Sequence, residues 1–129
     1  MKRIMQESYV DMYIDDNNIL HADWKGFLKL EKLKPAVDVM MDHIAKNKVT
    51  KHVSNHRQLQ VLSNDVRAFL ENEWFPRAEK AGINKMAAII SDNIFAEMSA
   101  KQVTEKAVKK SIETKYFVSS EDGAKWLNS

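Results

Sequence analysis

The sequence predicts a small α/β fold with a mixed, largely parallel sheet of four to five strands covered by about four helices. Two strand-like segments come first, and helices and strands then alternate. This order is typical of an α/β fold, because helices bury their apolar stripes by covering a sheet. The nearly continuous apolar run Lys85 to Ile90 is typical of a strand covered on both faces. The length of 129 residues, of which 44% are hydrophobic, predicts a single domain over residues 1–129.

The first two strands are expected to form a hairpin. From Ser8 to Ile14 polar and apolar residues alternate, which is typical of a strand with one face on the core. Asp15-Asp16-Asn17-Asn18 predicts a turn, because these side chains bond to nearby backbone and tolerate left-handed conformations. A second strand, Ile19 to Trp24, follows and is ended by Gly26. The side chains expected on the inner face are Val10, Met12, Ile14, Leu20, Ala22 and Trp24.

A helix follows, with apolar residues at steps of three and four. Because Pro35 is tolerated only in the first turn, the regular helix should begin near Glu31 to Lys34 and run to about Asn47. Val49 to Asn55 is then predicted as a strand, and Asn55 to Leu62 as a loop. The apolar stripe of the helix is Leu30, Leu33, Val37, Met41 and Ile44.

The next helix is predicted to begin at Ser63, a residue type favoured at the N-cap. Pro76 lies inside its apolar pattern, so we expect this helix to bend there rather than end. Gly82 provides the stop. The expected buried stripe is Val66, Phe69, Leu70, Trp74 and Ala78.

After the strand Lys85 to Ile90, the pattern predicts a third helix, a last strand and a closing helix. Ser99 and Gln102 have the spacing of a capping box, so the third helix should run to about Lys110. Ile112 to Val118 is expected to be the last strand. Ser119 with Asp122 then begins the closing helix, in which Ala124 and Leu127 face inward.

Composition and charge exclude several classes of function. The 20 basic and 18 acidic side chains leave a net charge of +2 and are mixed along the chain, which argues against nucleic-acid binding. The sequence has no cysteine, so disulfides, thiolate nucleophiles and zinc fingers are excluded. The first eight residues lack the apolar stretch of a secretory signal, and Met86 to Ile90 is too short to cross a bilayer. We therefore expect a cytoplasmic protein that is not an integral membrane protein; a homo-oligomer is compatible with this sequence.

The element order, together with three local stretches, resembles the small bacterial STAS-like proteins related to anti-sigma-factor antagonists. These stretches are Trp24-Lys25-Gly26, Trp74-Phe75-Pro76-Arg77-Ala78 with Gly82, and Phe117 to Leu127. The resemblance implies a mixed sheet of four or five strands and relatives that bind proteins or, more distantly, apolar ligands. Regulatory members carry a phosphorylatable Asp-Ser-Ser or Asp-Ser-Gly stretch where this chain reads Val53-Ser54-Asn55-His56-Arg57, so the resemblance does not carry their phosphorylation switch over.

Metal and cofactor sites are not expected. His52 and His56 are four apart, but their segment is predicted as strand and loop, and no third ligand has a clear spacing. Asp15-Asp16 has the composition of a turn more than of a cation site. The sequence contains no Gly-x-Ser-x-Gly elbow, phosphate loop or Rossmann fingerprint, so no catalytic residue is assigned. The lysines of the third helix are interpreted as a solvated face: Lys101, Lys106, Lys109 and Lys110.

One location is predicted to be functional. In sheets of this type ligands bind beyond the carboxyl ends of the strands, where Asn55, His56, Ser91 and Asp92 are expected to converge as a binding surface. We expect a non-enzymatic interaction or regulatory protein acting through this surface. Two alternatives remain open: a binding module for a small apolar or lipid-like ligand, and an enzyme working through His56 and Asp92. The partner of the interaction protein would be an unidentified protein, and that of the binding module would be a small apolar molecule.

Overall fold

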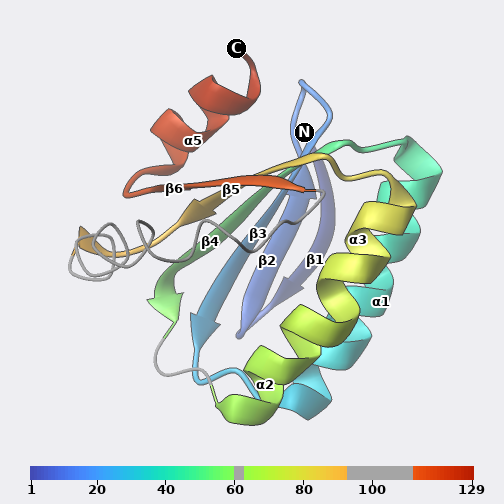
Figure 1. Cartoon of the computed structure of the whole chain (residues 1–129), viewed down its shortest axis with the longest axis vertical. Helices are drawn as coiled ribbons and strands as arrows, with labels where there is room; N and C mark the ends of the chain where they lie inside the picture. Colours follow the sequence, from blue (N-terminus) through green and yellow to red (C-terminus); the bar gives the residue numbers. More distant parts are fainter. Residues whose placement is uncertain (60–62, 93–111) are drawn as a thin grey trace.

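Six strands form one sheet in the computed structural model, which describes residues 1–59, 63–92 and 112–129 (Figure 1). In chain order they are β1 (Lys2–Glu7), β2 (Val10–Ile14), β3 (Ile19–Gly26), β4 (Lys51–Leu59), β5 (Lys85–Ile89) and β6 (Glu113–Phe117). Each strand pairs with the next one in the chain. The pairings β1 to β2 and β2 to β3 are antiparallel, and the other three are parallel. The sheet is therefore mixed and largely parallel, as predicted.

The expected number of four to five strands is too low, because β1 was not predicted. None of the six residues of β1 is buried, so its sequence carries no apolar alternation. The strand lies at the edge of the sheet and pairs with β2 through a register that shifts between Arg3 and Met5. An edge strand of this kind forms because β2 offers free backbone groups, which local sequence does not report.

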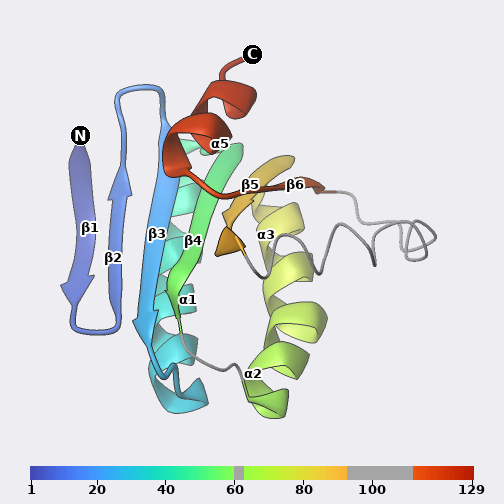
Figure 2. The same ribbon diagram turned by 90° about the vertical axis from the view of Figure 1, so that its left-hand side faces the viewer.

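Helices cover the two faces of the sheet unequally (Figure 2). One face, here called the helix face, is covered by α1 (Leu30–Asn47) and by α2 (Asn64–Phe69), η1 (Leu70–Trp74) and α3 (Phe75–Ala81). The other face, here called the α5 face, is covered at its β4–β6 side by α5 (Ser120–Leu127). Predicted inner residues such as Met12, Leu20 and Trp24 belong to the hydrophobic cluster on the helix face. The smaller cluster on the α5 face consists of Ile19, Val53, Ala87, Ile89 and Leu127.

The helix continues through Pro76 instead of ending there, as predicted. The segments α2, η1 and α3 follow one another without a break, and η1, directly before Pro76, is π-helical. Because proline has no amide hydrogen to donate, a locally widened turn before it accommodates the lost backbone bond. Gly82 ends this helix in a left-handed conformation, with φ of 118°, as its sequence position predicts.

Two further helix predictions have different outcomes. Ser119 caps α5, since its Oγ accepts a hydrogen bond from the Asp122 amide at 3.1 Å. Ser63 occupies the N-cap position of α2, but its hydroxyl donates to Asp65 Oδ1 instead of accepting from a helix amide. The predicted helix from Ser99 to Lys110 lies outside the described residues. Within the described part of the chain, no helix is long and apolar enough to span a bilayer.

Candidate functional site

The carboxyl end of β5 lies beside Asn55, which the structure places within β4 and not at its end. Asn55 of β4 is opposite Ile89 of β5 in the parallel register, and Ser91 and Asp92 follow directly after β5. Asp92 is exposed, and Ser91 is half-buried. Two of the four predicted residues therefore follow the end of β5, whereas Asn55 and His56 lie within the neighbouring strand β4.

Asn55 and His56 nevertheless project from opposite faces of β4. Asn55 is the register neighbour of Ile89, whose side chain belongs to the cluster on the α5 face. His56 contacts Ser54, which is the register neighbour of Ala22 in the cluster on the helix face. Because successive strand side chains alternate between faces, a single ligand on one face meets one of these two side chains and not both.

A β-bulge lies at the end of β4. Asp23 is opposite Asn55, but Lys25 is opposite Gln58, so His56 and Arg57 together face the single residue Trp24. Asn55 Oδ1 accepts a hydrogen bond from the Arg57 amide at 3.1 Å, which holds the bulged backbone. The predicted loop from Asn55 onward is therefore strand as far as Leu59, and the bulge turns its side chains away from regular alternation. The Arg57 guanidinium donates to the carbonyl of Val118, joining this end of β4 to the start of α5.

His56 forms a close pair with Ser54. Its Nε2 lies 2.6 Å from Ser54 Oγ, and Ser54 is buried. Burial lowers the pKa of His56 to about 4, although its side chain keeps some contact with solvent, so the ring is neutral at pH 7. A base with so low a pKa takes a proton from a serine hydroxyl poorly at neutral pH. The pair therefore suits a structural or binding role better than nucleophilic catalysis.

His52 lies two residues before Ser54 on the same helix face of β4. Its Nδ1 donates to the carbonyl of Leu20 at 2.8 Å, and burial lowers its pKa to about 4. Its other ring nitrogen, Nε2, is a buried acceptor with no hydrogen-bond partner among the described residues. The ring also lies 5.6 Å from that of Trp74. His52 and His56 are four residues apart in a strand, about 13 Å, which is too far for both to bind one metal ion. No group of three or more His, Asp or Glu side chains in the described ranges is placed to hold a metal.

The Asp15-Asp16 segment forms the predicted turn. Asp15 Oδ1 accepts hydrogen bonds from the amides of Asn17 and Ile19, at 2.9 and 3.0 Å. Its Oδ2 lies 2.8 Å from His21 Nε2, and the ring of His21 stacks on Tyr13. Burial alone would raise the pKa of Asp15, but the bonds from His21 and the two amides lower it below the usual value. The carboxylate of Asp15 is therefore engaged within the hairpin.

A residue that the sequence analysis missed lies at the same edge as the predicted site. Phe27 follows Gly26, the last residue of β3, and is 57% exposed. Gly26 has φ of +69°, a left-handed conformation that turns the chain out of the sheet, and the next residue after Phe27, Leu28, is buried. The signal available in the sequence was a large aromatic residue directly after a strand-ending glycine.

Comparisons with known proteins give one informative result. No family model and no curated protein matches the sequence. The structure is similar to that of an uncharacterised DUF3478-family protein from Shewanella loihica PV-4 with a SpoIIAA-like fold, at a TM-score of 0.66 and 17% sequence identity. The match covers 95% of this chain and 98% of the other. The fold is SpoIIAA-like. The predicted STAS-like architecture is therefore confirmed.

Proposed function

We propose that this SpoIIAA-like chain is a non-enzymatic interaction protein that recognises a protein partner at the carboxyl ends of its parallel strands. The carboxyl-end surface is defined here by Phe27, Asn55, His56, Ser91 and Asp92, with Asn55 reached from the α5 face of β4 and His56 from its helix face. Phe27 carries the proposal, because it and Met1 are the large hydrophobic side chains that stay mostly exposed in the described residues. An exposed aromatic side chain on a well-fixed turn is a typical anchor of a protein interface.

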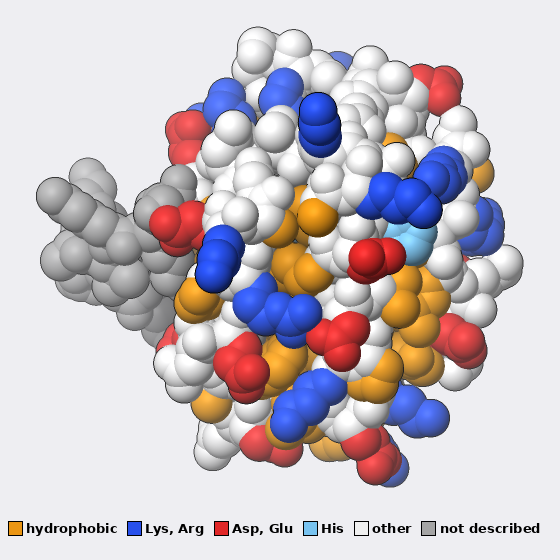
Figure 3. Space-filling model, turned by 90° about the vertical axis from the view of Figure 1, so that its right-hand side faces the viewer, with side chains coloured by type: hydrophobic (Ala, Val, Ile, Leu, Met, Phe, Trp, Pro, Cys, Tyr) orange, Lys and Arg blue, Asp and Glu red, His pale blue; other side chains and the backbone are white. Residues whose placement is uncertain are grey.

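The surroundings of Phe27 also suit a protein interface. Lys29, two residues after Phe27, is exposed, as are Arg57 of the neighbouring strand β4 and Asp92 after β5. Interfaces typically combine an apolar anchor with polar and charged residues at the periphery, and these exposed charges could serve in that way. On the side of the molecule formed by α1 and α3, acidic and basic side chains are scattered among apolar ones over the centre and lower half of the view (Figure 3).

The enzyme alternative receives less support. No hydrogen bond or ion pair joins His56 to Asp92 among the described residues, and the lowered pKa makes His56 a weak base. The partner of the His56 ring is instead Ser54, which is buried and hence poorly accessible to a substrate.

A second candidate function, binding of a small ligand inside the helix face, is favoured by His52. The buried Nε2 of this residue could accept a hydrogen bond from a hydroxyl group of a largely apolar ligand. Native mass spectrometry of the freshly purified protein tests this: an added mass that is lost in a folded His52→Leu variant supports the ligand, and the bare chain mass in the wild type argues against it.

Cross-linking followed by titration tests the main proposal. A photoreactive phenylalanine analogue placed at position 27 should cross-link one protein repeatedly, while the same analogue at exposed Glu79 on α3 should not. The captured protein is then purified and titrated against the wild type, Phe27→Ser and Glu79→Gln. We expect Phe27→Ser to weaken binding at least about tenfold, or ~1.4 kcal/mol, because truncating an interface anchor removes its apolar burial. Equal affinities for all three folded proteins would contradict the proposal.

A further inference from the structure

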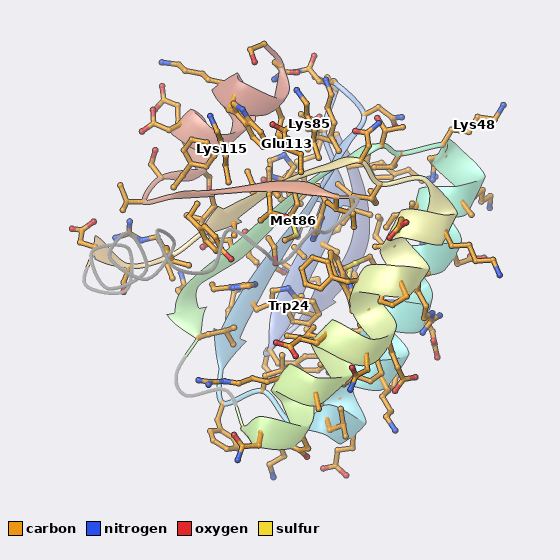
Figure 4. The ribbon with its side chains drawn as sticks, in the orientation of Figure 1. Trp24, Lys48, Lys85, Met86, Glu113 and Lys115 are labelled. Atoms are coloured by element: carbon orange, nitrogen blue, oxygen red, sulfur yellow. The ribbon has the colours of Figure 1, made fainter. Side chains whose placement is uncertain are left out.

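A group of lysines lies on the α5 face near the amino ends of the parallel strands, away from the carboxyl-end surface. Lys51 and Lys85 are register neighbours near the amino ends of β4 and β5, and Lys115 of β6 is opposite Ala87, two residues further along. Lys51 and Lys85 are each two residues from a member of the cluster Val53, Ala87 and Ile89, and Lys115 is the register neighbour of Ala87, so all three lysines share that face. Figure 4 shows Lys85, Glu113 and Lys115 close to one another beside α5.

These positive charges have little compensation within the structure. Neighbouring strands are ~4.8 Å apart, so Lys51 and Lys85 place two like charges side by side, which is unfavourable for the sheet alone. In the described part of the chain, none of the three lysines forms an ion pair. Glu113, the register neighbour of Lys85 on β6, is the one carboxylate on this face of β4, β5 and β6.

Trp126 of α5 organises two of the lysines. The Nζ atoms of Lys85 and Lys115 lie 5.3 and 5.4 Å from the centroid of its indole ring. The ring packs on Phe117 at 5.9 Å and is partly exposed. Attraction to the ring holds both ammonium groups near one place without neutralising them. The structure thus fixes cations in position and leaves their charge available.

We propose that the Trp126–lysine surface, made of Lys51, Lys85, Lys115 and Trp126, binds an acidic segment of a partner protein. Cations spaced along three adjacent strands can meet successive carboxylates of an extended peptide, whose same-side side chains are ~7 Å apart. Single-stranded nucleic acid fits less well, because base stacking needs a free aromatic face and the lysines lie over this ring. This surface lies near the amino ends of the strands, and the carboxyl-end surface lies toward their other ends. The two proposals therefore succeed or fail separately.

Titration with a fluorescent octaglutamate peptide tests the surface. We expect saturable binding that weakens with added salt and that falls about tenfold in Lys85→Gln/Lys115→Gln, since two charge contacts are lost. Lys34→Gln/Lys80→Gln removes the same charge from exposed positions on α1 and α3 and should change affinity less than about twofold. Equal losses in both folded double variants would show a general charge effect and overturn the proposal, as would tighter binding of an oligouridine of the same length.

Carbodiimide coupling tests the same proposal on the unmodified protein, in case the double variant does not fold. The reagent joins a lysine to a carboxylate in direct contact, and peptide mapping then locates the joined lysine. Coupling of octaglutamate concentrated at Lys51, Lys85 and Lys115 supports the surface. Coupling spread equally over Lys34, Lys80 and the other exposed lysines overturns it.

Discussion

Gly123 of α5 lies so close to Ile89 of β5 that a β-carbon on Gly123 would stand 2.9 Å from Ile89 Cδ1. The same β-carbon would stand 3.0 Å from Ala87 Cβ, which no change of rotamer can move. The missing side chain therefore allows the helix to rest directly on the sheet. This close approach buries Leu127 and brings Trp126 against Phe117.

Gly123→Ala should destabilise the protein despite the higher helix propensity of alanine. Propensity alone would add ~1 kcal/mol, but forcing a methyl group into this contact costs ~1 to 3 kcal/mol, so we expect a net loss of about 1 kcal/mol. Urea unfolding measures it, with Lys125→Ala at a position 74% exposed as the control. A more stable Gly123→Ala variant would show that α5 is not packed this closely.

Two serines at helix starts should respond differently to replacement by alanine. Ser119→Ala removes an acceptor for the Asp122 amide and should cost ~1 kcal/mol. Ser63→Ala removes a hydroxyl that donates to the exposed carboxylate of Asp65, so its effect should stay below ~0.5 kcal/mol. Thermal unfolding of both variants compares them directly, and an equal loss in both would contradict this assignment of the caps.

Stability should fall as the pH drops from about 6.5 to about 4. Burial lowers the pKa of His52 and His56 to about 4 in the folded chain, from 6.5 when unfolded. Between these values the unfolded chain takes up protons that the folded chain does not. The contribution of the two neutral rings to the unfolding free energy is therefore fully present above pH 6.5 and decreases as the pH falls toward 4. His52 alone accounts for roughly 2 to 3 kcal/mol of this loss. Unfolding free energies across this range should show a shallower slope in His52→Leu, whereas parallel slopes would contradict the buried neutral ring.

His56→Ala should lower the free energy of unfolding more than Asp92→Ala does. His56→Ala leaves the buried hydroxyl of Ser54 without its partner, which should cost ~1 to 3 kcal/mol. Asp92 is exposed, and its replacement should stay within ~0.5 kcal/mol of the wild type. Denaturant unfolding of the two single variants decides this, and a neutral His56→Ala would show that the pair with Ser54 contributes little.

The features that could be predicted from the sequence are those in which nearby residues determine the backbone. The Asp15-Asp16-Asn17-Asn18 turn forms through bonds from Asp15 to its own neighbours, and Gly82 ends its helix because its own conformation allows it. The apolar stripe of α1 and the run in β5 face the core for the same local reason, since their periodicity matches helix and strand. These patterns were sufficient for the SpoIIAA-like architecture.

The tertiary structure alone decided the edge strand β1, the extension of β4 to Leu59 and the placement of the candidate site residues. β1 and the end of β4 exist because a neighbouring strand completes their backbone hydrogen bonds, and such pairing joins residues far apart in the chain. The separation of Asn55 from His56 follows from the extension of β4 beyond Asn55. The pairing of Lys51 with Lys85, and the placement of Lys85 and Lys115 against Trp126, depend on register across several strands. A shift of one residue in that register would move each side chain to the other face, so no local pattern can specify which residues meet.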